Sequence, residues 1–196
     1  SSPDEKCRQL AKCGLRFAPE EIVSASHALE EVAADEALRG KRVFRMGSLG
    51  RPCYAELAGM LAVSEPADIA GCAAVIIGER RYDWETTFNA VINHLLAQPD
   101  CRLIVPNPDM YFLDRRERIA LAPGAIARLI RETLRDAGLI VQPILLGKPH
   151  ARIFRHAHAV LERRSRRRLA RERVMIIGDS LAADIKGAQD FHYTTA

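Results

Sequence analysis

Residues 174–185 read VMIIGDSLAADI. The first four are apolar, as in a buried strand of a parallel sheet. They place Asp179 just beyond the carboxyl end of that strand, where ligands bind in open α/β sheets, and Asp184 follows five residues later at the start of the next predicted helix. Two carboxylates at one sheet edge repel each other unless a cation lies between them, and oxygen ligands suit Mg²⁺. The segment therefore predicts a magnesium site; the alternative is that Asp179 is a loop residue and Asp184 a helix cap.

A second apolar strand, residues 144–146, is followed by the turn Gly147-Lys148-Pro149. This places Lys148 at the tip of a strand, with a proline that stiffens the way into the next helix. A phosphate beside that ammonium group would gain on the order of 4 kcal/mol at an effective dielectric constant of about 20, before desolvation is subtracted. The alternative is a solvated loop lysine, which most lysines are. The position at a strand end favours phosphate binding.

Elsewhere the chain alternates apolar strands with amphipathic helices. We predict strands around residues 41–47, 73–77, 103–105, 144–146 and 174–177, and helices over residues 53–61, after Asp83, and over 124–137 and 151–161, preceded by two helical stretches near the N-terminus. Continuous apolar strands separated by helices are typical of a parallel sheet covered on both faces. The predicted fold class is therefore α/β.

Composition excludes several classes of protein. With 48% hydrophobic and 28% charged residues among 196, the chain has the make-up of an ordinary globular protein. Its longest apolar stretch is far below the roughly 18 residues of a membrane span, and its start lacks a signal-peptide pattern, so we expect a cytoplasmic protein without a membrane partner. Five cysteines without a Cys-x-x-Cys pair argue against a disulfide framework and a structural zinc site.

The order strand-Gly-Lys-Pro, helix, strand-Gly-Asp-x-x-x-x-Asp closely resembles motifs three and four of the haloacid-dehalogenase-like phosphohydrolases. More narrowly, it resembles their class IIA branch, which includes 4-nitrophenylphosphatases and bacterial nucleotide monophosphatases. Three further segments are similar, in order, to signatures of that branch's cap domain: residues 75–78, Asn107-Pro108-Asp109 and residues 122–125. Together with the N-terminal helices, the resemblance covers essentially the whole chain.

The resemblance implies a Rossmann-like parallel-sheet core with a large α/β cap domain inserted into it. The core would be discontinuous, over residues 1–17 and 139–196, and the cap would span residues 18–138. An exposed cap face would be compatible with a homodimer.

The resemblance also implies Mg²⁺-dependent hydrolysis of small phosphate monoesters, of the sugar phosphate, nucleotide or 4-nitrophenyl phosphate type, through an aspartyl phosphate. Lys148 would hold the nucleophile and the substrate phosphate, Asp179 would bind Mg²⁺, and Asp184 would orient the metal site. Asn107 and Asp109 would contribute to substrate specificity from the cap. Their alternative is an ordinary Asn-Pro-Asp turn.

One departure from the family concerns the nucleophile, which lies in an Asp-x-Asp-Gly motif on the first core strand. No Asp-x-Asp occurs anywhere in the 196 residues. We therefore expect a chain truncated at both ends and inactive by itself, with the alternative that the catalytic half lies on another molecule. A noncatalytic homologue that binds phosphate and Mg²⁺ is the rival to the enzyme.

A dense basic run offers a rival of another class, a nucleic-acid-binding module. Its arginines are Arg163, Arg164, Arg166, Arg167, Arg168, Arg171 and Arg173. Such a run could contact nucleic-acid phosphates, but it contains no aromatic residue on which a base could stack. We therefore predict a solvated helix end, and a small phosphorylated metabolite rather than nucleic acid as the partner.

Overall fold

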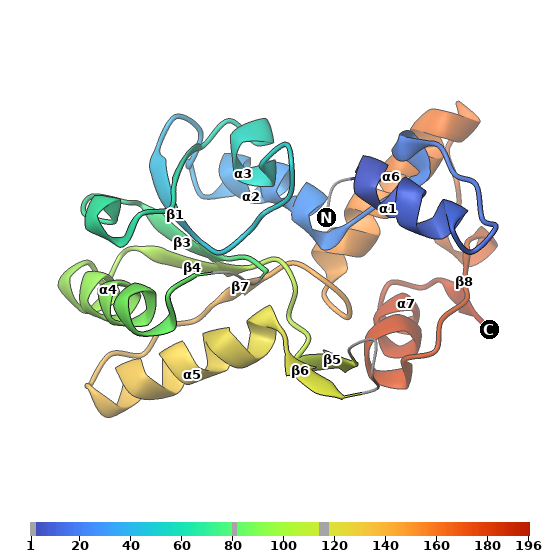
Figure 1. Cartoon of the computed structure of the whole chain (residues 1–196). Helices are drawn as coiled ribbons and strands as arrows, with labels where there is room; N and C mark the ends of the chain where they lie inside the picture. Colours follow the sequence, from blue (N-terminus) through green and yellow to red (C-terminus); the bar gives the residue numbers. More distant parts are fainter. Residues whose placement is uncertain (1–2, 80–81, 114–117) are drawn as a thin grey trace. The chain divides into compact units, whose positions relative to one another are not determined.

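The computed structural model describes residues 3–79, 82–113 and 118–196. The chain forms two compact units, one over residues 29–145 and a smaller one that joins residues 3–28 to residues 146–196 (Figure 1). Each unit has its own hydrophobic cluster.

Secondary structure in the larger unit alternates between strands and helices. Its elements are α2 (Leu29–Asp35), β1 (Arg42–Met46), α3 (Tyr54–Leu57), β2 (Leu61–Val63), a 3₁₀ turn (Pro66–Asp68), β3 (Ala74–Ile77), α4 (Trp84–Ala97), β4 (Arg102–Val105), β5 (Tyr111–Leu113), β6 (Ile119–Leu121), α5 (Pro123–Asp136) and β7 (Ile144–Leu145).

The smaller unit is mainly helical. Its elements are α1 (Pro3–Ala11), 3₁₀ turns at Pro19–Glu21, Ala25–Ala28 and Arg171–Arg173, α6 (Ala151–Ser165), β8 (Met175–Ile176), a π-helical turn (Leu181–Ile185), α7 (Lys186–Asp190) and β9 (Thr194–Thr195).

Five parallel strands form the sheet of the larger unit, in the order β2-β1-β3-β4-β7. Strand β3 lies at its centre and all four of its residues are buried, as its uninterrupted apolar sequence predicts. In the register, Val75 lies between Phe44 of β1 and Leu103 of β4. The predicted α/β class is confirmed.

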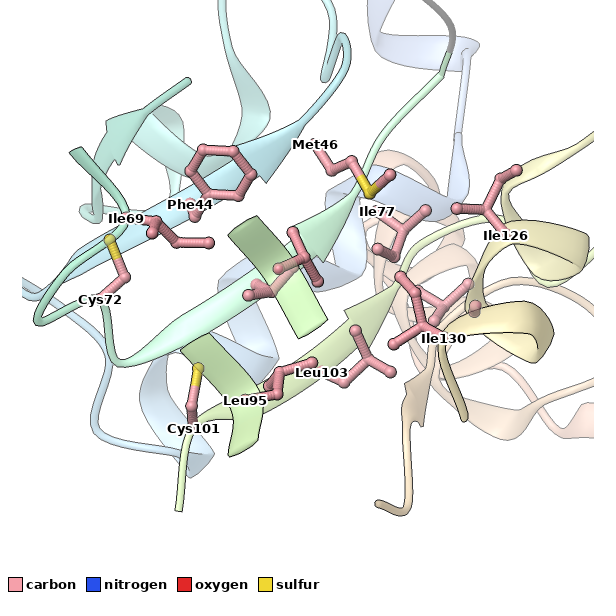
Figure 2. Packing of buried hydrophobic residues seen from close by; sticks show 14 of the residues in the cluster. Phe44, Met46, Ile69, Cys72, Ile77, Leu95, Cys101, Leu103, Ile126 and Ile130 are labelled. Carbon is pink, nitrogen blue, oxygen red and sulfur yellow. The ribbon is translucent and has the colours of Figure 1, made fainter. Parts of the chain in front are cut away.

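Helices cover both faces of this sheet: α4 and α5 lie on one side, α2 and α3 on the other (Figure 1). Helix α5 buries Ile126, Ile130 and Leu134, which recur at helical spacing. They join Phe44 and Leu103 in one hydrophobic cluster, shown in Figure 2. Complete burial of one such side chain contributes about 1.5–3 kcal/mol, so this cluster is the main source of stability in the larger unit.

Three short strands of the larger unit, β2, β5 and β6, were not predicted. The helix expected over residues 53–61 is limited to Tyr54–Leu57, because Gly59 has a φ of +83° that ends helical geometry, and β2 begins two residues later. Strands β5 and β6 pair with each other in an antiparallel hairpin. Their side chains are mostly exposed, so they lack the alternation of buried and exposed residues by which strands are recognised.

The smaller unit is held by aromatic packing between α6 and the end of the chain. The ring of Phe154 lies 5.8 Å from that of Phe191, which in turn meets Tyr193 edge-on at 5.1 Å between ring centroids. Strands β8 and β9 pair in parallel, with Met175 opposite Thr194. The strand predicted around residues 174–177 is therefore present but shorter.

The limits of the units differ from the predicted domain boundaries. Residues 18–28 lie in the smaller unit, and residues 139–145 in the larger one, where β7 pairs with β4. That the larger unit is a cap inserted into a phosphatase core stays a prediction. None of the helices in the described part of the chain combines the length and the apolar composition needed to span a membrane.

Candidate functional site

Lys148 lies in the turn that precedes α6. The backbone N–H of His150 donates to the carbonyl of Gly147 at 3.0 Å and closes this turn, and α6 begins at Ala151. The side chain of Lys148 is half exposed. Its ammonium group can therefore be reached from solvent.

The ammonium group of Lys148 donates a hydrogen bond to Oδ1 of Asp184, and the two side chains form an ion pair. Asp184 is one of the few buried polar residues of the described chain, with a side chain only 9% exposed. Two of the predicted site residues, 36 positions apart in the sequence, are thus in direct contact. Because a buried carboxylate needs a partner, the pair satisfies Asp184 while Lys148 keeps further N–H donors.

Asp184 also stabilises the turn that follows β8. Its Oδ2 accepts the backbone N–H of Ser180 at 3.3 Å, and its own N–H donates to the carbonyl of Ser180 at 2.8 Å. Ser180 Oγ accepts the N–H of Ala183 at 3.2 Å, which caps the π-helical turn. The N-cap residue is therefore Ser180 and not Asp184, which lies inside the turn, binds the N–H of the N-cap residue and contacts Lys148.

Gly178 makes room for Asp184. A Cβ atom at position 178 would lie 2.5 Å from both Cβ and Cγ of Asp184, and 2.8 Å from its Oδ2. Side chains at these distances would overlap, so only glycine lets the backbone after β8 pass this close to the carboxylate. The glycine before Asp179 is thus explained by the packing of Asp184.

Gly187 likewise makes room for the turn that contains Lys148. A Cβ there would lie 2.6 Å from Cε2 of Phe154 and 2.8 Å from Cα of Pro149. The start of α7 is therefore packed directly on α6 and on the residue that follows Lys148. This contact fixes the distance between the turn that contains Lys148 and the segment that contains Asp184.

Asp179 differs from Asp184 in being exposed. Within residues 3–79, 82–113 and 118–196, no three His, Cys, Asp or Glu side chains come close enough together to form a metal site by themselves. Mg²⁺ does not require three, because it is commonly held by one or two carboxylates together with water and phosphate oxygens. Asp179 is thus an exposed carboxylate five positions before the buried, lysine-paired Asp184, and its binding of Mg²⁺ stays a prediction.

His150 borders the same turn. Burial lowers the pKa of its imidazole below the usual value near 6.5, which favours the neutral ring at pH 7. The half-exposed Lys148 is consequently not opposed by a second positive charge two residues away.

Asn107 and Asp109 lie in the larger unit, in the turn after β4. Asn107 Oδ1 accepts the backbone N–H of Asp109 at 3.0 Å, and the carbonyl of Asp109 accepts the N–H of Gly124 at 3.0 Å. Asn107 thus forms the turn that the alternative interpretation describes, while the carboxylate of Asp109 is exposed. Their contribution to substrate specificity stays a prediction.

Several residues of the arginine run have partners inside the smaller unit. Arg164 pairs with Glu21 at 2.9 Å, and Arg171 lies 4.1 Å above the ring centre of Phe191. Arg168 is 3.7 Å from the carboxylate of Glu162. Arg164, Arg168 and Arg171 therefore make contacts within the protein, as arginines at the end of a helix commonly do.

Sequence analysis did not single out Gly178, Ser180 or Gly187. In the sequence, Gly178 is part of the Gly-Asp motif, Ser180 stands at the N-cap position, and Gly187 follows Asp184 by three residues. The reason for each glycine, a missing Cβ, becomes visible only when the neighbouring side chain is placed.

The comparisons with known proteins connect part of the sequence with haloacid-dehalogenase-like hydrolases and the whole chain with the fold of known phosphatases. Residues 145–196, which contain Lys148, Asp179 and Asp184, match the sequence profile of the family described as HAD-hydrolase-like. The resemblance predicted from the sequence is therefore confirmed. No curated protein sequence matches the chain significantly.

Solved structures show the same fold over the whole chain. A p-nitrophenyl phosphatase from Archaeoglobus fulgidus aligns with 99% of this chain and 67% of its own, at a TM-score of 0.77 and 22% identity. An NPPase from Geobacillus stearothermophilus gives a TM-score of 0.81 at 19% identity, over 100% of this chain and 71% of its own. A glycerol phosphate phosphatase from Mycobacterium tuberculosis, in complex with magnesium, gives 0.80 at 20% identity, over 100% and 54%. The chain thus spans about two thirds of the first two proteins and about half of the third.

Proposed function

We propose that this chain carries the lysine and magnesium half of a phosphatase that hydrolyses small phosphate monoesters. The observation that carries the proposal is the ion pair of Lys148 with the buried Asp184, beside the exposed Asp179. A lysine held by a buried carboxylate has a fixed position, which a solvated loop lysine lacks.

Lys148 would offset the charge of the substrate phosphate. Asp184 holds its ammonium group from one side, and the remaining N–H donors are free to meet phosphate oxygens from solvent. Positive charge that is already in position stabilises the charge that develops on the phosphoryl group without reorganisation at the moment of reaction.

Asp179 would hold Mg²⁺, with Asp184 keeping the turn and the lysine in place. When bound, the metal would supply further charge compensation to the phosphate oxygens. The close approach of Gly178 to Asp184 supports this arrangement, because it brings the backbone next to Asp179 near the second carboxylate.

The attacking carboxylate is not among the 196 residues, since they contain no Asp-x-Asp. The family resemblance implies that an Asp-x-Asp-Gly strand would supply it, and the proposal assigns to the larger unit the role of the cap. The names of the structural neighbours, p-nitrophenyl and glycerol phosphate phosphatases, support small phosphate monoesters as the substrate class.

The test requires a version of the protein in which an Asp-x-Asp-Gly strand precedes Ser1, either encoded by its gene or grafted. We expect this version to hydrolyse 4-nitrophenyl phosphate with Mg²⁺ and to lose the activity in excess chelator. Lys148→Ala should lower turnover by about 100-fold or more, as removal of a preorganised charge donor does.

Lys186 provides a matched control. It lies in the same unit, is exposed and pairs with Asp190 at 2.8 Å, so Lys186→Ala should leave turnover unchanged. Full activity in chelator, or equal effects of the two lysine substitutions, would refute the proposal. Mg²⁺ and phosphate binding without any turnover would favour the noncatalytic homologue.

A further inference from the structure

A cavity in the larger unit contains none of the residues Lys148, Asp179 and Asp184 in its lining. It has a volume of about 410 Å³ and lies beside α5, next to the turn after β4 and to strand β7. Met110, Pro143 and Leu145 give it apolar walls, and Arg128 and Arg131 contribute two guanidinium groups. This is the size and the mixture of surfaces that small organic ligands use.

Helix α5 forms one wall through a single stripe of residues. Gly124, Arg128 and Arg131 follow each other at spacings of four and three, so these three positions lie on the same side of the helix. A Cβ at position 124 would lie 2.6 Å from the carbonyl oxygen of Asp109, whose backbone Gly124 also binds at 3.0 Å. The absence of that Cβ allows the turn after β4 to close the cavity directly against the helix.

The cavity carries positive charge that its own residues do not neutralise. Nε of Arg131 is buried and has no hydrogen-bond partner in the described structure. The one carboxylate in the lining, Glu132, pairs with Arg135. Over the described ranges of the chain, neither Arg128 nor Arg131 forms an ion pair. Because a guanidinium group stays charged and a buried donor without a partner is unfavourable, these groups call for an anion.

We propose that this cavity binds a small organic oxyanion, a carboxylate or a phosphate ester that carries an apolar group the size of one ring. The guanidinium group of Arg131 binds the oxyanion, since its planar N–H donors match two oxygens of such a group. Arg128, at the exposed rim, adds a second charge, and the apolar walls hold the ring.

The experiment measures binding to the 196-residue chain by titration calorimetry, with benzoate and phenyl phosphate as probes and neutral benzamide as the comparison. We expect at least one of the two anions to bind at least tenfold more tightly than benzamide. The tighter of the two identifies the oxyanion as carboxylate or phosphate.

Substitutions then locate the site. Arg131→Met keeps the apolar stem and removes the charge, so it should weaken anion binding at least tenfold. Arg128→Met, at an exposed position where folding is not at risk, should weaken it several-fold. Arg39→Met, an exposed residue of the same unit outside the cavity lining, should change it less than twofold.

Lys148→Ala separates this inference from the proposed phosphatase, because it should leave anion binding unchanged even if Lys148 proves essential for turnover. The inference is overturned if neither anion binds at millimolar concentration, if benzamide binds as tightly as the anions, or if both Arg128→Met and Arg131→Met bind as the unaltered chain does. It is also overturned if Lys148→Ala abolishes the binding, since the anion would then occupy the other site.

Discussion

The ammonium group of Lys148 is held by Asp184, a carboxylate 36 residues away whose side chain is only 9% exposed. The lysine itself is half exposed. The pair therefore joins a buried anchor to an accessible cation. This arrangement leads to measurable expectations about the two residues and the turn around them.

The first expectation is energetic coupling between the two charges. The test is a double-mutant cycle with Lys148→Met and Asp184→Asn, in which urea unfolding of the smaller unit is followed. We expect a coupling free energy of about 1–2 kcal/mol between the two substitutions. The exposed pair Lys186 and Asp190, four residues apart on α7, should show only about 0.3–0.5 kcal/mol. Equal couplings would mean that burial of Asp184 does not strengthen the pair.

The second expectation concerns Gly178. Gly178→Ala would place a methyl group 2.5 Å from Cβ and Cγ of Asp184, so the turn must shift. We expect a loss of about 1–3 kcal/mol in unfolding free energy, the usual cost of overpacking. Ala182→Ser, an exposed substitution in the same turn, should change it by less than about 0.5 kcal/mol. A neutral Gly178→Ala would contradict the packing described here.

The third expectation is that the 196-residue chain does not hydrolyse 4-nitrophenyl phosphate. Neither a lysine nor a metal-binding carboxylate replaces a missing covalent nucleophile, whose removal usually abolishes nearly all turnover. The measurement is release of 4-nitrophenol with and without Mg²⁺. Turnover that persists through purification and disappears in Asp179→Asn would show that the chain contains its own nucleophile.

The fourth expectation is a loss of stability in acid that depends on His150. Burial lowers the pKa of this imidazole in the folded chain, so the unfolded chain binds the proton more readily. The contribution of the neutral ring to stability is present above the unfolded pKa, near 6.5, and is lost as the pH falls through the lower folded pKa. Thermal unfolding between pH 8 and pH 5 should show this decrease, and His150→Gln should reduce it. An unchanged pH profile in His150→Gln would assign the effect to other groups.

The sequence predicted the elements that are buried. Strands β3 and β4 were expected from residues 73–77 and 103–105, because burial on both faces requires uninterrupted apolar residues. Strand β2 and the β5–β6 hairpin were missed, since three-residue strands whose side chains are exposed or only partly buried carry no such pattern. Patterns of local sequence thus report burial more reliably than strand pairing.

The candidate site was predictable in its members but not in its contacts. The order of the Lys148 turn and the 174–185 segment indicated that their polar residues belong together. Sequence could not indicate that Asp184 faces the lysine while Asp179 is exposed, because this depends on how α7 packs against α6. The cavity beside Arg131 was not anticipated for a similar reason, as its walls come from three separate segments between residues 108 and 145.

Gly187 limits how far the sequence can diverge while the fold around α7 is kept, and it can therefore help to recognise remote homologues. At about 20% identity, as with the phosphatases of known structure, most side chains have been exchanged. A position where any Cβ would meet both Phe154 and Pro149 at 2.6–2.8 Å admits no exchange without moving α7. Three points therefore define a compact signature for detecting remote homologues: Lys-Pro, Gly-Asp with an aspartate five positions on, and a glycine three positions after that. The last of these, the glycine, is required by the packing of α7 rather than by a chemical role in the site.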